Sequence, residues 1–388
     1  MSGTFDAIVI GAGSVGTPLS YELSAAGLKT LVIEALASPG QGQNKAAIGG
    51  VRATHSDPAK ILICKQSLGI LSAWEKRFGY DIGWKPGGYC FPVYTEKIEA
   101  TLKGILPTQK SYGLDIDWVG PDDIARIVPG VNPDGLRGGT YSPGDGQVSP
   151  LRAVNAHERE ARKLGAVFRY KEPVTSIRVA RGKVVGVDTT AGRYDAALVV
   201  IAAGASARRV ASFAGVDAPV TPDSHEAGIT APVEHFFAPL VVDLRPGPEG
   251  RTVNFYFGQN KEGQIIFCYT PKDLFIGEDR ESLSEFLPII SRRLVGLIPR
   301  LRHVLVRRVW RGSYPMTPDG IPIADRAPGV DGLYLGVGMC GQGFMLGAGM
   351  AKNLASFITT GKPVIAEDVW KLLRADRNFG ASKKEALK

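Results

Sequence analysis

The hydrophobic pattern at the start of the chain predicts a strand, a helix and a second strand. Residues Phe5–Ile10 alternate little between apolar and polar side chains and are rich in β-forming residues, as in a buried parallel strand. A helical pattern then covers Ser14–Ala26 and ends at Gly27, a residue type that commonly follows the last helical turn. The apolar run KTLVIE, residues 29–34, is the second strand, so the segment forms a compact βαβ unit.

The strand-to-helix pattern recurs in the middle and near the end of the chain. Residues Ala197–Ala202 form a buried strand that ends in AAGA and leads into a helix. The segment GLYLGVGMCGQGFMLGAGMAKNLASFITTG, residues 332–361, again combines a strand, a glycine loop and a helix. Between these segments, residues 216–318 contain strand-like runs rich in aromatic residues, such as NFYFGQ, which favour an antiparallel lobe.

These patterns predict an α/β domain assembled from separate segments, together with a second domain of antiparallel strands. The Rossmann-like α/β domain is expected over residues 1–50, 142–215 and 319–388, and the second domain over residues 51–141 and 216–318. Further helices are expected over Pro58–Phe78, Thr95–Tyr112, Pro121–Ile127, Pro150–Leu164 (with Ser149 as N-cap) and Ser282–Leu297.

The turn after the first strand has the glycine spacing of a dinucleotide-binding motif. Gly11 allows a tight turn, Gly13 lets the backbone approach a pyrophosphate, and Gly16 lets the helix pack closely on the strand. Glu34 ends the second strand about 20 residues further on, where an acidic side chain binds ribose hydroxyls. Because all parts occur in order, the motif predicts a nucleotide at the helix N-terminus.

Composition narrows the class of protein. The 388 residues are 44% hydrophobic and 22% charged, which is ordinary for a globular protein. The net charge is +8, but the basic residues are scattered, which favours a solvated basic surface over a nucleic-acid site. Four widely spaced cysteines contain no CxxC pair, so we expect neither a metal site nor a disulfide framework. With no secretory leader and no long apolar run, we expect a cytoplasmic protein without a membrane span.

Three glycine-marked strand ends spread over the chain favour FAD over NAD, because the extended FAD molecule needs contacts from several segments. The chain also resembles the D-amino-acid oxidase superfamily of FAD-dependent oxidoreductases, and within it the sarcosine oxidase β-subunit type, which includes proline dehydrogenase β-subunits. The resemblance rests on AIVIGAGSVGTPLSYELSAAGLKTLVIE, GGVRATH, AAGASA, WRGSYPMTPDGIPI and GMCGQGFMLGAGMAKNLASFITTGKP, which occur in the family's order over nearly the whole chain.

The resemblance implies a Rossmann-like FAD-binding domain and a substrate domain built on a mixed, mainly antiparallel sheet. It implies oxidation of the C–N bond of a small carboxylated amine or imino acid (proline, hydroxyproline, sarcosine or an opine) by hydride transfer to flavin N5. It also implies a possible hetero-oligomer with electron-transfer subunits. FAD contacts are expected at Gly11, Gly13, Ser14, Val15, Gly16, Glu34, Ala35, Gly42, Gln43, Ile48, Val174, Ala203, Gly204, Gly341, Gln342, Gly343, Phe344 and Met345.

The resemblance also suggests substrate and catalytic residues. Arg52, in GGVRATH, resembles the arginine that pairs with a substrate carboxylate; the alternative is a structural ion pair. Tyr314 stands where glycine and D-amino-acid oxidases have an arginine, which favours the secondary-amine branch. Met345 replaces a carboxylate-binding lysine of monomeric sarcosine oxidases. Tyr256 and His225 are further candidates for the substrate pocket and for catalysis, and each has a structural alternative.

Three sequence features concern how the flavin is held and reoxidised. Gly312 occupies the position of the cysteine that links flavin covalently in some relatives, so we expect non-covalent FAD and treat Cys340 as a packing residue. Ile266 is aligned with a lysine that activates oxygen, so we expect a dehydrogenase more than an efficient oxidase. His55 is a possible pocket residue.

Other functions stay open at this point. An FAD-dependent 2-hydroxy-acid or glycerol-phosphate dehydrogenase would share the FAD signals and differ only in the substrate pocket. A stand-alone amino-acid oxidase would make hydrogen peroxide. A flavoprotein subunit with a degenerate active site is the non-enzymatic alternative.

Overall fold

A six-stranded sheet forms one half of the protein. The structure is a computed structural model that describes residues 2–380 and 387. The strand order is β10-β3-β2-β14-β21-β20, and all neighbours are parallel except β20, which runs antiparallel to β21. The strands are β2 (Ala7–Ile10), β3 (Thr30–Ile33), β10 (Val167–Arg169), β14 (Leu198–Ile201), β20 (Ile323–Arg326) and β21 (Leu333–Val337).

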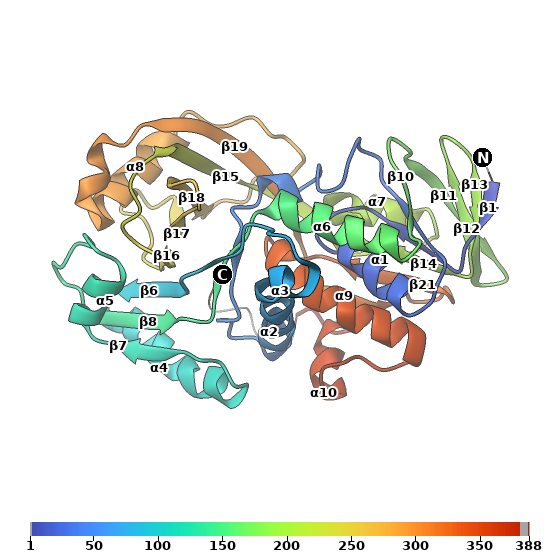
Figure 1. The fold of residues 1–388 in the computed structure, drawn as a ribbon, viewed down its shortest axis with the longest axis horizontal. Coiled ribbons are helices and arrows are strands. Elements are labelled where there is room, and N and C mark those ends of the chain that lie inside the picture. Colours follow the sequence, from blue (N-terminus) through green and yellow to red (C-terminus); the bar gives the residue numbers. More distant parts are fainter. Residues whose placement is uncertain (1, 381–386, 388) are drawn as a thin grey trace.

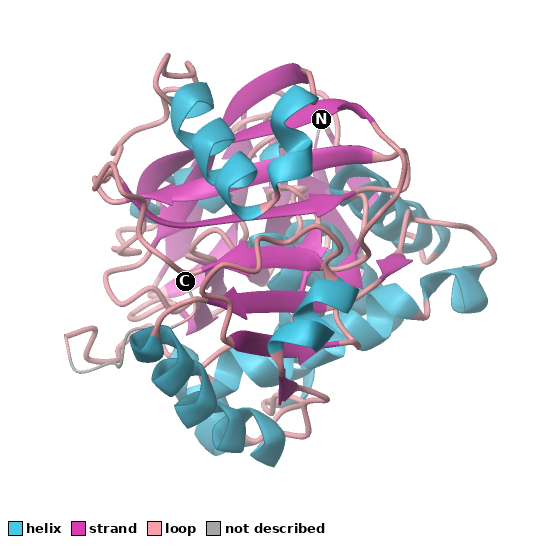
Figure 2. Ribbon diagram, turned by 90° about the vertical axis from the view of Figure 1, so that its left-hand side faces the viewer, coloured by secondary structure: helices cyan, strands magenta, loops and turns pink. Residues whose placement is uncertain are grey.

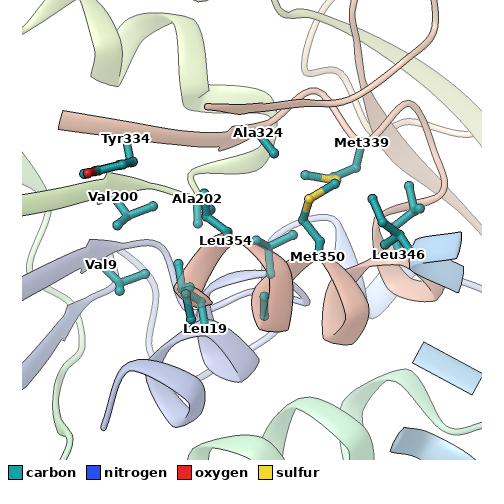
Figure 3. Close-up of a cluster of buried hydrophobic side chains, with 14 of the residues drawn as sticks. Val9, Leu19, Val200, Ala202, Ala324, Tyr334, Met339, Leu346, Met350 and Leu354 are labelled. Carbon is teal, nitrogen blue, oxygen red and sulfur yellow. The ribbon is translucent and has the colours of Figure 1, made fainter. Parts of the chain in front are cut away.

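The two faces of this sheet are covered differently. Val9, Leu19, Val200 and Leu354 belong to one buried cluster, in which the sheet packs against helices (Figure 3). The opposite face packs on a four-stranded sheet of order β1-β13-β12-β11. Strands buried on both faces explain why the sequence shows uninterrupted apolar runs. The helices of the first face are α1 (Gly16–Ala25), α2 (Pro58–Ser72), α6 (Pro150–Lys163) and α9 (Gly343–Thr360). The strands of the four-stranded sheet are β1 (Ser2–Thr4), β11 (Val174–Ala180), β12 (Lys183–Thr189) and β13 (Arg193–Asp195).

An eight-stranded sheet forms the other half of the protein, with the order β19-β15-β18-β17-β16-β6-β8-β7. Neighbouring strands of this sheet are antiparallel except β16 and β6, whose parallel contact joins two distant segments into one sheet. Figure 2, viewed from this end of the molecule, shows helices in front of the strands. The strands are β6 (Tyr89–Val93), β7 (Asp117–Val119), β8 (Gly138–Ser142), β15 (Thr221–Pro232), β16 (Leu240–Asp243), β17 (Thr252–Gln259), β18 (Gln264–Pro271) and β19 (Val306–Met316).

The two halves lie side by side along the longest axis of the molecule, and smaller elements complete the fold (Figure 1). A three-stranded sheet pairs β9 with β4 on one side and β5 on the other. Its strands are β4 (Gly50–Val51), β5 (Lys85–Pro86) and β9 (Gly146–Gln147). The remaining helices are α3 (Trp74–Phe78), α4 (Glu96–Ser111), α5 (Pro121–Ile127), α7 (Ala207–Ser212), α8 (Phe286–Leu297), α10 (Glu367–Trp370) and the 3-10 turns η1 (Asn44–Ala46), η2 (Gly204–Ser206), η3 (Pro299–His303) and η4 (Lys371–Leu373).

The fold confirms the predicted class, an α/β half and a mixed, mainly antiparallel half, whereas the exact domain boundaries stay a prediction. Two expected helices differ from the sequence prediction. The helix expected over Pro58–Phe78 is two helices, because the chain leaves helical geometry at Ala73. The helix expected from Ser282 begins only at Phe286, since the preceding residues run along β15 and Leu283 N–H donates to Glu226.

Among the residues that the structure describes, no helix is long and apolar enough to span a membrane.

Candidate active site

A continuous cavity begins at the carboxyl ends of the parallel strands and extends to the face of the eight-stranded sheet. From β2 the chain continues to β3 on one side of it, whereas the later strand β14 pairs with β2 on its other side. The strand order therefore reverses between β2 and β14. Crevices outside the carboxyl ends of strands at such a reversal are the usual ligand sites of open α/β sheets. The cavity therefore joins a nucleotide-type crevice to the second half of the protein.

The glycine motif has the local geometry that a pyrophosphate site requires. Gly11 has a φ of +109°, and a Cβ on it would lie 2.5 Å from the carbonyl oxygen of Ala202. A Cβ on Gly16 would lie 1.8 Å from the Gly11 carbonyl oxygen, so these two glycines are required for backbone packing. Gly13 lines the cavity and has no atom within 4 Å of an added Cβ. The N-terminus of α1 thus faces an open cradle where an anionic group binds favourably.

Glu34 follows β3 and lines the same cavity. Its Oε2 accepts the Ala12 N–H at 2.8 Å and its Oε1 accepts the Leu36 N–H at 2.9 Å, which fixes the carboxylate. Each carboxylate oxygen has further lone-pair capacity. Glu34 can therefore accept the two hydroxyls of a ribose without losing its backbone partners.

Two later segments complete the cavity wall on the flavin side. The Gln43 Oε1 accepts the Ala205 N–H at 3.4 Å, linking the loop after β3 to the turn after β14. The loop Gly341–Met345 leads into α9, whose N-terminus also lies at the cavity. Gln342 Oε1 and Ser313 Oγ are buried and have no hydrogen-bond partner within the described chain. A polar ligand in the cavity would satisfy both atoms, so the residues present fit FAD.

Arg52 is the first residue of the loop that follows β4, and it lines the same cavity. It is buried, and its guanidinium lies 5.9 Å from the ring centre of Tyr89 and 5.7 Å from that of Phe91. Its Nη1 donates to the Thr54 carbonyl, and its Nη2 donates to the Leu387 carbonyl at 2.6 Å. A carboxylate would accept from a guanidinium more strongly than a neutral carbonyl does.

Asp145 holds the backbone next to Arg52. Its Oδ1 accepts the Ala53 N–H at 3.0 Å, and its main-chain carbonyl accepts the Gly88 N–H at 2.9 Å. Burial raises the pKa of Asp145 to about 7, although the Ala53 N–H and the Arg52 charge act in the opposite direction.

The pH dependence of stability should report this buried carboxyl. Because burial raises the native pKa of Asp145, its stabilising contribution is complete below its ordinary pKa of 3.8 and is lost as pH rises through about 7. We expect Asp145→Asn to remove this dependence, so that the free energy of unfolding of the wild type falls relative to the variant between those pH values. Urea unfolding at stepped pH measures this. Parallel curves for the two proteins would contradict it.

Tyr314 and Tyr256 form a hydroxyl pair in the part of the cavity wall that the eight-stranded sheet contributes. Their hydroxyl oxygens lie 2.8 Å apart, and the His225 ring lies 3.9 Å from that of Tyr314. A Cβ on Gly341 would lie 2.2 Å from the Tyr314 ring, so this ring lies directly against the predicted flavin loop. Burial raises the pKa of both tyrosines well above 10, so both hydroxyls stay protonated and can donate hydrogen bonds.

His225 is oriented by Asp223. The His225 Nε2 lies 3.2 Å from the Asp223 Oδ2, and the Asp223 Oδ1 accepts the Phe275 N–H at 2.7 Å. Burial raises the pKa of Asp223, but the His225 and backbone hydrogen bonds outweigh it, so the net pKa lies below the ordinary value. Asp223 therefore connects the imidazole to the loop that follows β18.

The structure brings the predicted site residues together, although their roles stay predictions. All of them line the cavity except Gly16, which lies behind it: Gly11, Gly13, Ser14, Val15, Glu34, Ala35, Gly42, Gln43, Ile48, Arg52, Val174, Ala203, Gly204, His225, Tyr256, Tyr314, Gly341, Gln342, Gly343, Phe344 and Met345.

Two residues considered as cavity candidates from the sequence do not line the cavity. His55 does not line it, but is buried with its Nε2 3.5 Å from the Cys64 sulfur, because its strand-loop turns into the core. Ile266 does not line it either; Cys268 and Thr270, further along β18, are the lining residues of that strand. Neither is a cation, so the conclusion about the absent lysine is unchanged.

Sequence reasoning also missed three charged residues at the cavity. Arg209, Glu278 and Arg280 line it and are exposed. Glu278 and Arg280 belong to the irregular segment between β18 and α8, and they match no motif. Only the long-range pairing of this segment with β15 brings them to the cavity, and no local signal encodes that pairing.

Comparisons with known proteins agree with this geometry. The family described as "FAD dependent oxidoreductase" (DAO) matches residues 6–357. The chain is similar to the mitochondrial dimethylglycine dehydrogenase of Rattus norvegicus, at 25% identity over 92% of this chain and 43% of that protein. It is also similar to sarcosine oxidase subunit beta of Rhodobacter capsulatus, at 22% identity over 94% of this chain and 87% of that one. The chain thus spans less than half the length of the mammalian dehydrogenases it matches.

Solved structures show the same fold. L-proline dehydrogenase from P. horikoshii superposes with a TM-score of 0.88 at 27% identity, covering 94% of this chain and 96% of that one. Glycine oxidase from Geobacillus kaustophilus gives a TM-score of 0.85 at 23% identity, covering 97% and 99% of the two chains. The family match covers both halves of the molecule and the whole cavity wall up to α9. The chain therefore belongs to the DAO family of FAD-dependent oxidoreductases.

Proposed function

We propose that this protein is an FAD-dependent dehydrogenase that oxidises the C–N bond of a small carboxylated amine or imino acid, such as proline, hydroxyproline, sarcosine or an opine. The observation that carries the proposal is that buried Arg52 and the Tyr256–Tyr314 pair line the same cavity as the flavin loops. FAD, when bound, supplies the hydride acceptor. The protein residues need only bind the substrate, orient it and exclude water from around it.

Arg52 is the proposed carboxylate anchor. Its guanidinium donates to the Leu387 carbonyl at 2.6 Å, and a substrate carboxylate would replace that acceptor with two charged oxygens. The ring faces of Tyr89 and Phe91 fix the guanidinium plane, so the anchor is oriented before substrate binds. Holding one end of the substrate rigidly turns hydride transfer into a positioned, effectively unimolecular step.

The rest of the cavity suits the amine end of such a substrate. Leu240, Val242 and Met345 supply apolar lining that excludes water, which favours a neutral amine over an ammonium. The hydroxyls of Tyr256 and Tyr314 are among the hydrogen-bonding groups that the eight-stranded sheet presents to the cavity. The relatives named for dimethylglycine, sarcosine and proline support an amine substrate of this class.

We expect molecular oxygen to reoxidise the reduced flavin slowly. Within the described chain the cations lining the cavity are Arg52, Arg209 and Arg280, and none of the lining residues is a lysine. Arg209 and Arg280 are exposed and Arg52 already donates to two backbone carbonyls, so we expect negative charge that develops on oxygen to find no dedicated cationic partner. We therefore propose electron transfer to a partner protein, in line with the relative named as a β-subunit.

FAD is expected to be held without a covalent bond. Gly312 lines the cavity where a linking cysteine would stand, and the Cys340 sulfur is engaged by the Gly338 carbonyl at 3.0 Å and the Thr317 hydroxyl at 3.3 Å. Acid or heat denaturation should release all flavin into the supernatant. Yellow colour or flavin mass that stays with the precipitated, digested protein would contradict this.

The visible spectrum of the oxygen-free holoprotein tests the function. Addition of L-proline, sarcosine or an opine should bleach the oxidised flavin, and readmitted air should restore it slowly. Rapid peroxide formation would favour an amino-acid oxidase. A spectrum bleached only by 2-hydroxy acids or glycerol phosphate would overturn the amine proposal.

A further inference from the structure

A strongly basic surface lies at one edge of the eight-stranded sheet. We call it the basic edge: Arg300, Arg302, His303, Arg307 and Arg308, contributed by η3 and the first residues of β19. All five side chains are exposed, and residues 299–316 contain no acidic residue. None of the five forms an ion pair within the described chain. Leu305 lies in their midst and is 74% exposed.

The basic edge surrounds strand backbone that no other strand covers. β19 is the terminal strand of its sheet, and among the residues that the structure describes it pairs only with β15 (Figure 1). One or two charged side chains on an edge strand suffice to discourage pairing with other strands. That role does not explain the three further basic residues on η3 or the exposed leucine between them. Arginine around an apolar spot is instead typical of protein interfaces.

A short path connects the basic edge to the flavin side of the cavity. The Arg308 guanidinium lies 5.9 Å from the ring centre of Trp310, on the same side of β19. The Trp310 indole N–H donates to the Ala46 carbonyl at 2.9 Å, and Ala46 lines the cavity. Gly312, two residues or about 7 Å further along the strand, lines it as well. A partner seated on the basic edge would therefore lie next to the loop that borders the flavin.

We propose that the basic edge docks an acidic electron-transfer protein, which reoxidises the reduced flavin. This inference rests on the proposed dehydrogenase function, in which oxygen is a poor acceptor. The reduced flavin holds two electrons, so it reduces two one-electron acceptors in turn and releases two protons to solvent. The complementary partner presents carboxylates around an apolar spot that accommodates Leu305. Opposite charge on the two faces increases the association rate and makes it sensitive to salt.

The test uses the FAD-loaded enzyme, reduced with dithionite in the absence of oxygen. The probes are an acidic blue-copper protein and a basic c-type cytochrome, each in its oxidised, one-electron-accepting form. Arg302→Gln/Arg307→Gln/Arg308→Gln removes exposed charges and spares Arg300, which contacts the Phe236 ring. The matched control is Lys171→Gln/Arg181→Gln/Lys183→Gln, three exposed cations near the four-stranded sheet at the other end of the molecule.

We expect the second-order rate of copper reduction at low salt to fall about ten-fold in the basic-edge variant and to lose most of its salt dependence. The dissociation constant of the copper(I) form, which accepts no electron, should rise to a similar extent. The control variant should match the wild type, and the basic cytochrome should react slowly with all three proteins. Because dithionite reduces the flavin, failure of amines to do so would count against the proposed function and leave this result untouched.

Three outcomes would overturn the docking proposal. The basic-edge variant could react with the acidic probe as fast as the wild type, which would make the edge an ordinary solvated surface. The control variant could lose as much rate, which would make the effect one of net charge. Anionic lipid vesicles or an RNA oligomer could bind the wild type as tightly as the copper protein and lose that binding in the same variant, which would make the surface a general anion site.

Discussion

Replacing Arg52 by lysine is expected to lower kcat/KM for the amine that reduces the flavin by about 100-fold, while FAD stays bound. Breaking one partner of a buried, hydrogen-bonded charge pair costs about 2–5 kcal/mol, and each 1.4 kcal/mol is about a factor of ten. Lysine keeps the charge but loses the planar fork that binds a carboxylate bidentately and lies on the rings of Tyr89 and Phe91. Stopped-flow flavin reduction at a series of substrate concentrations measures the change.

Arg209→Lys is the matched control, because Arg209 also lines the cavity but is exposed at the start of α7. We expect this variant to keep kcat/KM within about two-fold, since an exposed cation contributes little. If Arg52→Lys also stayed within two-fold, Arg52 would be a structural cation of the small sheet and the substrate would be anchored elsewhere.

Alanine substitutions in the glycine motif are expected to separate folding from FAD binding. At Gly16, a Cβ would lie 1.8 Å from the Gly11 carbonyl oxygen, so the helix must move away from the strand. Alanine is the better helix former by about 1 kcal/mol, so a loss of stability in Gly16→Ala would be caused by the clash alone. We expect its apoprotein to unfold several degrees below the wild type and to bind no FAD.

Gly13→Ala should behave differently, because its Cβ meets no atom within 4 Å and enters the cavity. Its apoprotein should unfold at the wild-type temperature, while FAD affinity falls at least ten-fold because the methyl group occupies the phosphate cradle. Thermal unfolding and FAD titration by flavin fluorescence measure the two properties. Tight FAD binding by Gly13→Ala would show that the pyrophosphate lies elsewhere in the cavity.

The sequence predicted the parts of this protein that local chemistry determines. Buried parallel strands give apolar runs, and Ser149, the predicted N-cap, accepts the Arg152 N–H at the start of its helix. Most residues expected at the FAD site lie in short motifs whose order resembles a known family, and their roles stay predictions. The parallel strands end at the same edge of the sheet, which brings the FAD candidates together, whereas His225, Tyr256 and Tyr314 reach the cavity from the eight-stranded sheet.

What the sequence did not predict depends on contacts between distant segments. The break at Ala73 has no Pro or Gly to mark it; Trp74, just after it, packs on His157 of α6. The periodicity of β18 does not distinguish Ile266 from Cys268, because both point to the same side of the strand and only the sheet decides which one reaches the cavity. No local pattern marks Asp145 as buried; tertiary contacts with the loop that carries Arg52 bury it.

The parallel contact between β16 and β6, with the return of α9 to the first strands, affects how this enzyme acquires its cofactor. The walls of the FAD cavity come from residues near 11, near 204 and near 343, so no stretch of the growing chain contains the site. Pairing of segments this far apart in sequence bears its loop-closure cost before any contact compensates for it, so such folds form slowly. FAD can therefore be captured only after α9 has been synthesised and has docked. Flavin then binds a chain in which these segments have already packed together, and this binding stabilises the native state by mass action.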